Sequence, residues 1–209
     1  MSLFAKKSPE DIFWKWFSEN ESKYFELEKD QENLLSQLSS KLTKYQDGAT
    51  YEISTKDKGI RELIISADGL KEIFPVVEQL VSSAPKLDRW KVIAFRPRQA
   101  DYMGFILNYS GEDFDPKKLW FYYRIEDGYF DLLLYHPTYT EEKRNLYIGA
   151  FYILLDSALG EYDVTMNLRY IDHAKLPDEP KEAGLTPFSE LREVFDTYKM
   201  NYPDKVHSR

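Results

Sequence analysis

The chain has 209 residues, of which 43% are hydrophobic and 16% aromatic, and its formal net charge is −8. The composition is typical of a globular protein with a packed core, while the negative charge argues against a nucleic-acid-binding protein, because that function needs a basic surface. Cysteine is absent, which excludes disulfide bonds and thiolate metal sites.

The first eleven residues, MSLFAKKSPED, contain no apolar core of a secretory signal peptide. The longest apolar run, residues 146–155, has ten residues, far fewer than the ~20 that a membrane-spanning helix needs. We therefore expect a cytoplasmic protein that does not interact with a membrane.

The N-terminal part of the chain predicts a pair of helices over residues 8–47. Ser8, followed by Pro9 and by Asp11 three positions after the serine, is a typical helix start. A second helix is expected from about residue 31 to residue 46, because leucines recur there every four positions.

Residues 50–172 predict strands with inserted helices. Alternating apolar and polar residues indicate strands at 50–55 and 60–66, and longer apolar patterns indicate helices at 70–83 and 141–159. Further strands are expected at 90–95, 102–109, 119–125, 129–135 and 162–171.

Together these elements predict one α+β domain, residues 1–209, with a mainly antiparallel sheet, helices packed on one face and the N-terminal helical pair. Residues 173–209 are expected to form a loop, a short helix and a tail. We expect a single contiguous sheet of at least five strands that carries the helices 70–83 and 141–159 on its apolar face.

Four segments in order, FWKWFSENE, ELIISADG, VVEQLVSSAPKLDRWKVIAFRPR and ILLDSALGEYD, resemble a family of uncharacterised bacterial proteins of the domain-of-unknown-function kind. The resemblance covers roughly residues 12–170, and the motifs are specific as a set rather than singly. It implies a bacterial cytoplasmic protein. The family carries no established activity and no catalytic residues that transfer to this chain.

Aromatic side chains are the first candidate ligand-binding residues. Trp14 and Trp16 are two positions apart in the first predicted helix, so their side chains point in different directions and one of them is expected near a surface. The candidates are Trp14, Trp90 at the start of a strand and His136 at the end of another. The alternative, which we favour for Trp14, is a helix that packs on two sides.

Arg96 and Arg98 are further candidate ligand-binding residues. They follow the strand 90–95 and point to one face if the chain stays extended, so that they form a clamp for a carboxylate or a phosphate. An acidic chain also offers internal partners, and we favour internal ion pairs. The three histidines lack metal-ligand spacing, so we expect neither a metal site nor a cofactor.

The segment FYILLDSALGEYD, residues 151–163, places Asp156 near the end of an apolar helix, with Glu161 and Asp163 just after it. A carboxylate at a helix C-terminus faces partial negative charge, and a buried carboxylate needs a compensating partner. The three acids are therefore candidate catalytic residues or structural anchors for the two arginines. We favour the anchor, and we expect Asp156 to pair with one of those arginines.

The expected function is binding or regulation without catalysis, in a soluble bacterial protein that recognises a protein or a small-molecule ligand through an aromatic-lined groove. One alternative is an enzyme for a small polar or anionic substrate, with one of the three acids as the acid–base group and the arginines as the clamp. Another is an acidic inhibitor or immunity-like protein that covers a basic partner.

Overall fold

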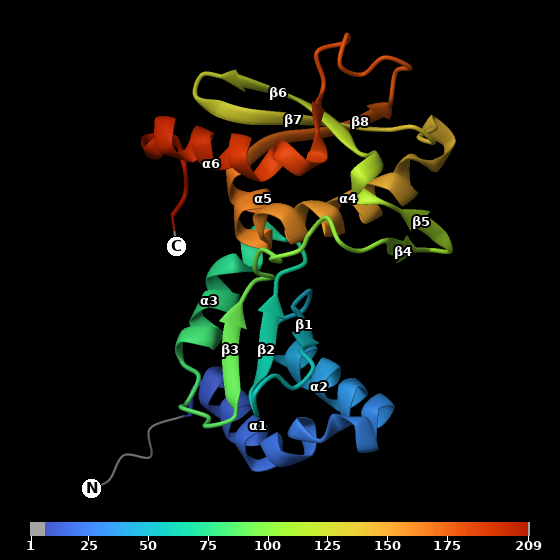
Figure 1. The fold of residues 1–209 in the computed structure, drawn as a ribbon. Helices are drawn as coiled ribbons and strands as arrows, with labels where there is room; N and C mark the ends of the chain where they lie inside the picture. Colours follow the sequence, from blue (N-terminus) through green and yellow to red (C-terminus); the bar gives the residue numbers. More distant parts are fainter. Residues whose placement is uncertain (1–6, 209) are drawn as a thin grey trace, which may run out of the picture. The chain divides into compact units, whose positions relative to one another are not determined.

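The computed structural model describes residues 7–208, and the protein has an α+β fold (Figure 1). Residues 1–6, which belong to the segment considered above for a signal peptide, lie outside the described residues. The chain divides into two compact units, with the boundary between Arg96 and Pro97. The single domain that we expected over residues 1–209 stays a prediction.

The first unit contains three helices and a three-stranded sheet. Their bounds are α1 Pro9–Phe25, α2 Gln31–Tyr45, β1 Thr50–Ile53, β2 Arg61–Ser66, α3 Phe74–Ser82 and β3 Trp90–Ala94. The central strand is β2, which pairs antiparallel with β1 and parallel with β3.

The start of α1 confirms the predicted capping pattern. The Ser8 hydroxyl accepts a hydrogen bond from the Asp11 N–H at 3.1 Å, and the Asp11 carboxylate accepts one from the Ser8 N–H at 3.2 Å. These two contacts satisfy donors that the first turn of a helix otherwise leaves unpaired, so the helix begins at a defined residue.

The sheet of the first unit packs against α1 through aromatic rings. Phe17 and Phe25 of α1 contact Trp90 of β3 with centroid distances of 5.3 and 6.1 Å. The indole N–H of Trp14 donates to the Leu80 carbonyl of α3 at 2.7 Å. The middle of α1 is thus held by both the sheet and α3.

The second unit contains three helices, a four-stranded sheet and a short hairpin. Their bounds are β4 Leu107–Tyr109, β5 Glu112–Phe114, β6 Trp120–Glu126, β7 Tyr129–His136, α4 Arg144–Leu159, α5 Glu161–Asn167, β8 Leu168–Lys175, β9 Thr186–Pro187 and α6 Leu191–Asn201. The sheet order is β8-β7-β6-β9, in which only β7 and β8 run parallel.

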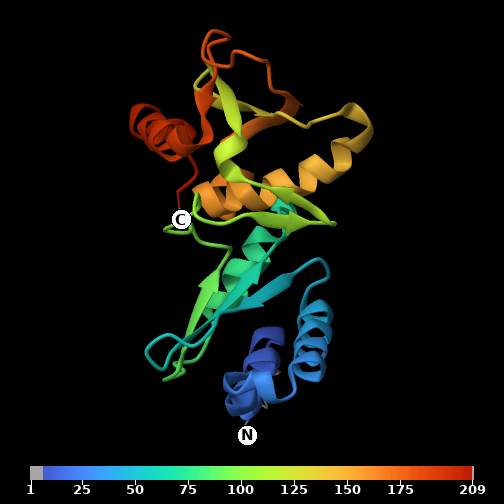
Figure 2. The ribbon, with the colours of Figure 1, turned by 45° about the vertical axis from the view of Figure 1, so that its right-hand side comes forward.

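The core of the second unit lies under one face of its sheet. Phe130 of β7 contacts Phe195 and Tyr198 of α6 at centroid distances of 5.5 and 5.1 Å, and His136 of the same strand lies 6.1 Å from Phe151 of α4. Residues 130 and 136 share a face because strand side chains alternate. Both helices therefore cover the same face (Figures 1 and 2).

Two expectations about strands are wrong. The strands within residues 7–208 belong to three separate sheets, of three, two and four strands, rather than to one sheet of at least five strands. Residues 161–167 form the helix α5 rather than the start of a strand. The buried side chains of α5, Glu161, Val164 and Asn167, recur every three residues, as a packed helix requires.

No helix within residues 7–208 is both long and apolar enough to cross a membrane.

Arg61 links the strands of the first unit to its helical pair. Its side chain is only 2% exposed, and it donates to the carbonyls of Phe25 and Ser54 at 2.9 and 2.6 Å and to the carboxylate of Glu28. A buried guanidinium that serves three acceptors replaces the water that these groups would otherwise bind.

We expect Arg61→Met to lower the free energy of unfolding by about 3 kcal/mol, because it leaves the carbonyl groups of Phe25 and Ser54 without their side-chain donor. Urea unfolding measures the change. Glu28→Gln is the matched control and should have a much smaller effect, since the Glu28 side chain is 59% exposed. Equal stability of Arg61→Met and the parent protein would show that Arg61 does not hold these elements together.

Candidate functional site

The candidate site is a groove formed by α1 and α2 in the first unit. Its volume is about 630 Å³, which lies within the range of small-molecule sites. The described residues that line it are Lys7, Ser8, Pro9, Ile12, Phe13, Trp16, Lys41, Lys44 and Tyr45.

One wall of the groove is apolar and comes from α1. Pro9, Ile12, Phe13 and Trp16 are spaced by three, one and three residues, so they lie on one side of the helix. Phe13 is buried and contacts Trp16 at a centroid distance of 6.0 Å, whereas Ile12 is 59% exposed. The wall therefore combines a fixed aromatic base with an accessible aliphatic side chain.

The other wall is basic and comes from α2. Lys41 and Lys44 are three residues apart and both are exposed, so their side chains lie on the same side of the helix. The Lys41 ammonium lies 5.3 Å from the centre of the Trp16 ring, within the range of a cation–π interaction. This contact joins the basic wall to the apolar one.

Tyr45 closes the groove between the two helices. Its ring contacts Phe13 at a centroid distance of 6.2 Å, and its hydroxyl donates to the Glu10 carboxylate at 2.8 Å. Burial and the contact with Glu10 raise the pKa of Tyr45 above its usual range. Hydrogen bonding by its own backbone N–H, followed by that of Tyr45, lowers the pKa of Glu10. The pair therefore stays a neutral donor and an ionised acceptor near neutral pH.

Two predicted ligand-binding tryptophans lie in the core instead. Trp14 is 3% exposed and Trp90 is 6% exposed, and the Trp90 indole donates to Glu21 at 3.0 Å. Neither lines the groove, and the residue that does is Trp16. The physical reason is that α1 packs on two sides: the side with Trp14 faces α3, which leaves Trp16 on the side of α2.

The third predicted residue of this kind, His136, is also buried. His136 and His173 lie on adjacent strands of the second unit and are 3% and 6% exposed. The backbone N–H of Thr138 donates to the His136 Nδ1, with 3.3 Å between the two nitrogens. The His136 Nε2 and both ring nitrogens of His173 have no hydrogen-bond partner among the described residues. Burial lowers the pKa of each histidine to about 4. Both rings are therefore neutral near pH 7.

Within residues 7–208, no group of three or more histidine, aspartate or glutamate side chains is placed to hold a metal ion.

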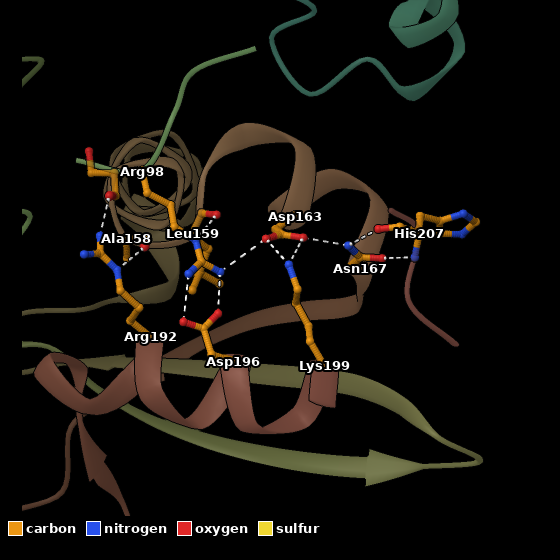
Figure 3. Close-up of polar contacts among 10 residues, drawn as sticks. Arg98, Ala158, Leu159, Asp163, Asn167, Arg192, Asp196, Lys199 and His207 are labelled. Atoms are coloured by element: carbon orange, nitrogen blue, oxygen red, sulfur yellow. Dashed lines mark hydrogen bonds and ion pairs between the residues drawn. The ribbon is translucent and has the colours of Figure 1, made fainter. Parts of the chain in front are cut away.

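Arg98 is engaged in an ion-pair network rather than free to clamp a ligand (Figure 3). Its Nε donates to the Leu159 carbonyl at 2.8 Å, and its two terminal nitrogens contact Asp196 at 2.7 and 2.9 Å and Asp163 at 3.2 Å. Lys199 adds a second cation, 2.8 Å from Asp163. Burial on its own would lower the pKa of Arg98. The two carboxylates outweigh this effect and raise the pKa, and Asp196 contributes more than Asp163.

A second arginine, Arg192, also binds carbonyl groups at the C-terminal end of α4. Arg192 donates to the Ala158 carbonyl at 2.8 Å, to the Ser157 carbonyl at 3.3 Å and to the Gln99 carbonyl at 2.8 Å. The last carbonyl groups of a helix have no partner within the helix and carry partial negative charge. Two guanidinium groups therefore satisfy the end of α4 (Figure 3).

The predicted anchor is confirmed for Asp163, which binds Arg98, Lys199 and, at 2.7 Å, the Asn167 amide. Glu161 is fully buried and Asp156 is half-buried. The pairing of Asp156 with an arginine stays a prediction.

Arg96 belongs to the first unit, where its side chain contacts Glu52 at 2.5 Å and Asp68 at 3.0 Å. The internal ion pairs that we favoured for the two arginines are therefore present in both units.

None of the residues that line the groove was among the ligand-binding residues predicted from the sequence. Trp16 was considered only as the neighbour of Trp14. The only signal for Lys41, Lys44 and Tyr45 was their place in the second predicted helix, where a lysine is typical of any solvated face.

Comparison of this chain with family models, curated proteins and solved structures finds no match. The resemblance to a bacterial family stays a prediction, and the site must be judged by its geometry alone.

We expect Arg98→Met to lower the free energy of unfolding by about 2–4 kcal/mol, since it removes the side-chain donor of the Leu159 carbonyl and one cation from Asp163 and Asp196. Arg98→Lys should have an intermediate effect, because a single ammonium cannot reach all three acceptors. Chemical denaturation measures both variants. A Met variant as stable as the parent protein would mean that the network is not an anchor.

We also expect stability to fall between about pH 6.5 and pH 4. The folded protein keeps His136 and His173 neutral down to about pH 4. In the unfolded chain the same two imidazoles take up protons from about pH 6.5. Acid therefore favours the unfolded state by up to about 3 kcal/mol per histidine. The measurement is urea unfolding at pH 7 and at pH 4.5.

His173→Phe should remove about half of this histidine-dependent loss, because it deletes one of the two buried imidazoles. His207→Gln is the control, because the His207 side chain is exposed. The hypothesis fails if His173→Phe and the parent protein lose the same stability between the two pH values.

Proposed function

We propose that this protein is a non-enzymatic binding protein of the bacterial cytoplasm, and that it holds a small ligand in the groove between α1 and α2. The observation that carries the proposal is the combination of a volume of about 630 Å³ with the aromatic and aliphatic side chains of Phe13, Trp16 and Ile12. Sites for small molecules are concave and mostly apolar, with a few polar groups that orient the ligand.

The size of the groove favours a small ligand over a protein partner. The lining of α1 runs from Pro9 to Trp16, a distance of roughly 10 Å at the rise of an α-helix. A stable protein–protein interface buries about 800 Å² on each partner, which needs a far larger surface than two turns of one helix.

The enzyme alternative finds less support in the positions of its candidate residues. Arg98 and Asp163 bind each other and further groups of the protein, so a substrate would have to displace these contacts. Neither residue belongs to the groove. The proposal therefore assigns them to stability and assigns ligand recognition to α1 and α2.

N-phenylnaphthylamine, a neutral dye that fluoresces in apolar surroundings, tests the proposal. We expect the parent protein to bind it in the groove and Ile12→Gln to weaken binding about fivefold, since a contact worth ~1 kcal/mol of apolar burial is lost. Fluorescence titration measures the affinity.

Met200→Gln is the matched control, because Met200 of the second unit is 73% exposed and does not line the groove. Binding of the dye that is equally strong in the parent protein and in Ile12→Gln, or no binding at all, contradicts the proposal.

A further inference from the structure

The groove has walls of opposite chemical character. The α1 wall consists of Pro9 and the side chains of Ile12, Phe13 and Trp16, and the α2 wall presents Lys41 and Lys44. A ligand that fills this space meets apolar groups on one side and ammonium groups on the other. A purely apolar ligand would leave the basic wall unused.

The ammonium groups of the groove are available to a ligand. Lys7, Lys41 and Lys44 form no ion pair with any of residues 7–208, and no acidic residue among these lines the groove. The Glu10 carboxylate, beside the groove, accepts a hydrogen bond from the Tyr45 hydroxyl, and the Asp11 carboxylate accepts one from the Ser8 N–H. Three cations therefore line the groove, and none of them is paired with either carboxylate.

This local charge is opposite to that of the whole molecule. The chain carries a formal net charge of −8, so an anionic ligand is repelled by most of the surface and is attracted only where cations gather. The lysines at the groove thus provide selectivity, while the apolar wall provides most of the affinity, because exposed ion pairs contribute little free energy.

Lys41 also sets the position of the anionic group. Its ammonium already lies 5.3 Å from the centre of the Trp16 ring, which restricts where that charge can lie. An anion bound to Lys41 is held beside the indole ring, so an apolar body attached to the anion can contact Trp16 and Ile12.

We infer that the ligand is a small organic anion with an apolar body, whose carboxylate, sulfonate or phosphate group lies toward Lys41 and Lys44 and whose body lies on the α1 wall. This inference rests on the proposed function, since it names the ligand class of the same groove.

The test compares two dyes that share one aromatic skeleton. Anilinonaphthalene sulfonate is N-phenylnaphthylamine with one added sulfonate, so the difference in affinity isolates the contribution of the anion. Both dyes are titrated with the parent protein, with Lys41→Gln/Lys44→Gln and with Lys15→Gln. Lys15 is the matched control, because it is an exposed lysine of α1 that pairs with Glu19 and does not line the groove.

We expect the parent protein to bind the sulfonate dye about five- to tenfold more tightly than the neutral dye. The double variant should bind the two dyes with similar affinity, whereas Lys15→Gln should keep the parent protein's preference for the sulfonate dye. Added salt should reduce the preference for the anion, because it screens exposed charges. Circular dichroism confirms that each variant is folded.

The outcomes separate the inference from the function that it extends. If the neutral dye binds through Ile12 but the sulfonate dye binds no more tightly, the proposed function stands and the anion inference is overturned. If only the sulfonate dye binds, through the two lysines and without a contribution from Ile12, the proposed function and the inferred contact of the apolar body with α1 are both overturned. If neither dye binds, both are overturned.

Discussion

The buried hydrogen bond from the Trp14 indole to the Leu80 carbonyl is the contact on which the arrangement of the first unit depends. At 2.7 Å it fixes the rotation of α1 about its own axis, because a buried indole N–H without an acceptor is costly. With Trp14 turned toward α3 and Phe17 toward Trp90, the side of α1 that carries Ile12 and Trp16 is left for α2. The groove exists because this aromatic helix cannot bury all of its sides.

The two units use charge in different ways. In the second unit, Arg98 and Arg192 bind the last carbonyl groups of α4, while Asp163 and Asp196 neutralise Arg98. In the groove of the first unit, Lys41 and Lys44 have no such partners among the described residues. The charges at the end of α4 are therefore satisfied within the fold, whereas these two lysines form no ion pair with any of residues 7–208.

Local patterns in the sequence predicted much of the secondary structure. The capping pattern at Ser8 and the recurrence of Leu34, Leu38 and Leu42 predicted α1 and α2, because these signals depend on residues within one or two turns. The class, α+β with a mainly antiparallel sheet, followed from the same local signals. The cost of an unpaired carboxylate near the end of α4 predicted an arginine partner for Asp156, which stays a prediction, while Asp163, a second of the three acids named as anchors, is the one that binds Arg98.

By itself the sequence determined the α-helices other than α5, most of the strands, the acidic character and the need for compensation around residues 156–163. Only the tertiary structure decided that the strands form three sheets and that Trp14 is buried while Trp16 lines a groove. The physical reason is that strand pairing and helix rotation depend on contacts between residues far apart in the chain. An apolar residue in the sequence indicates only a tendency to be buried. The tertiary contacts decide whether its side chain is buried and against which residues.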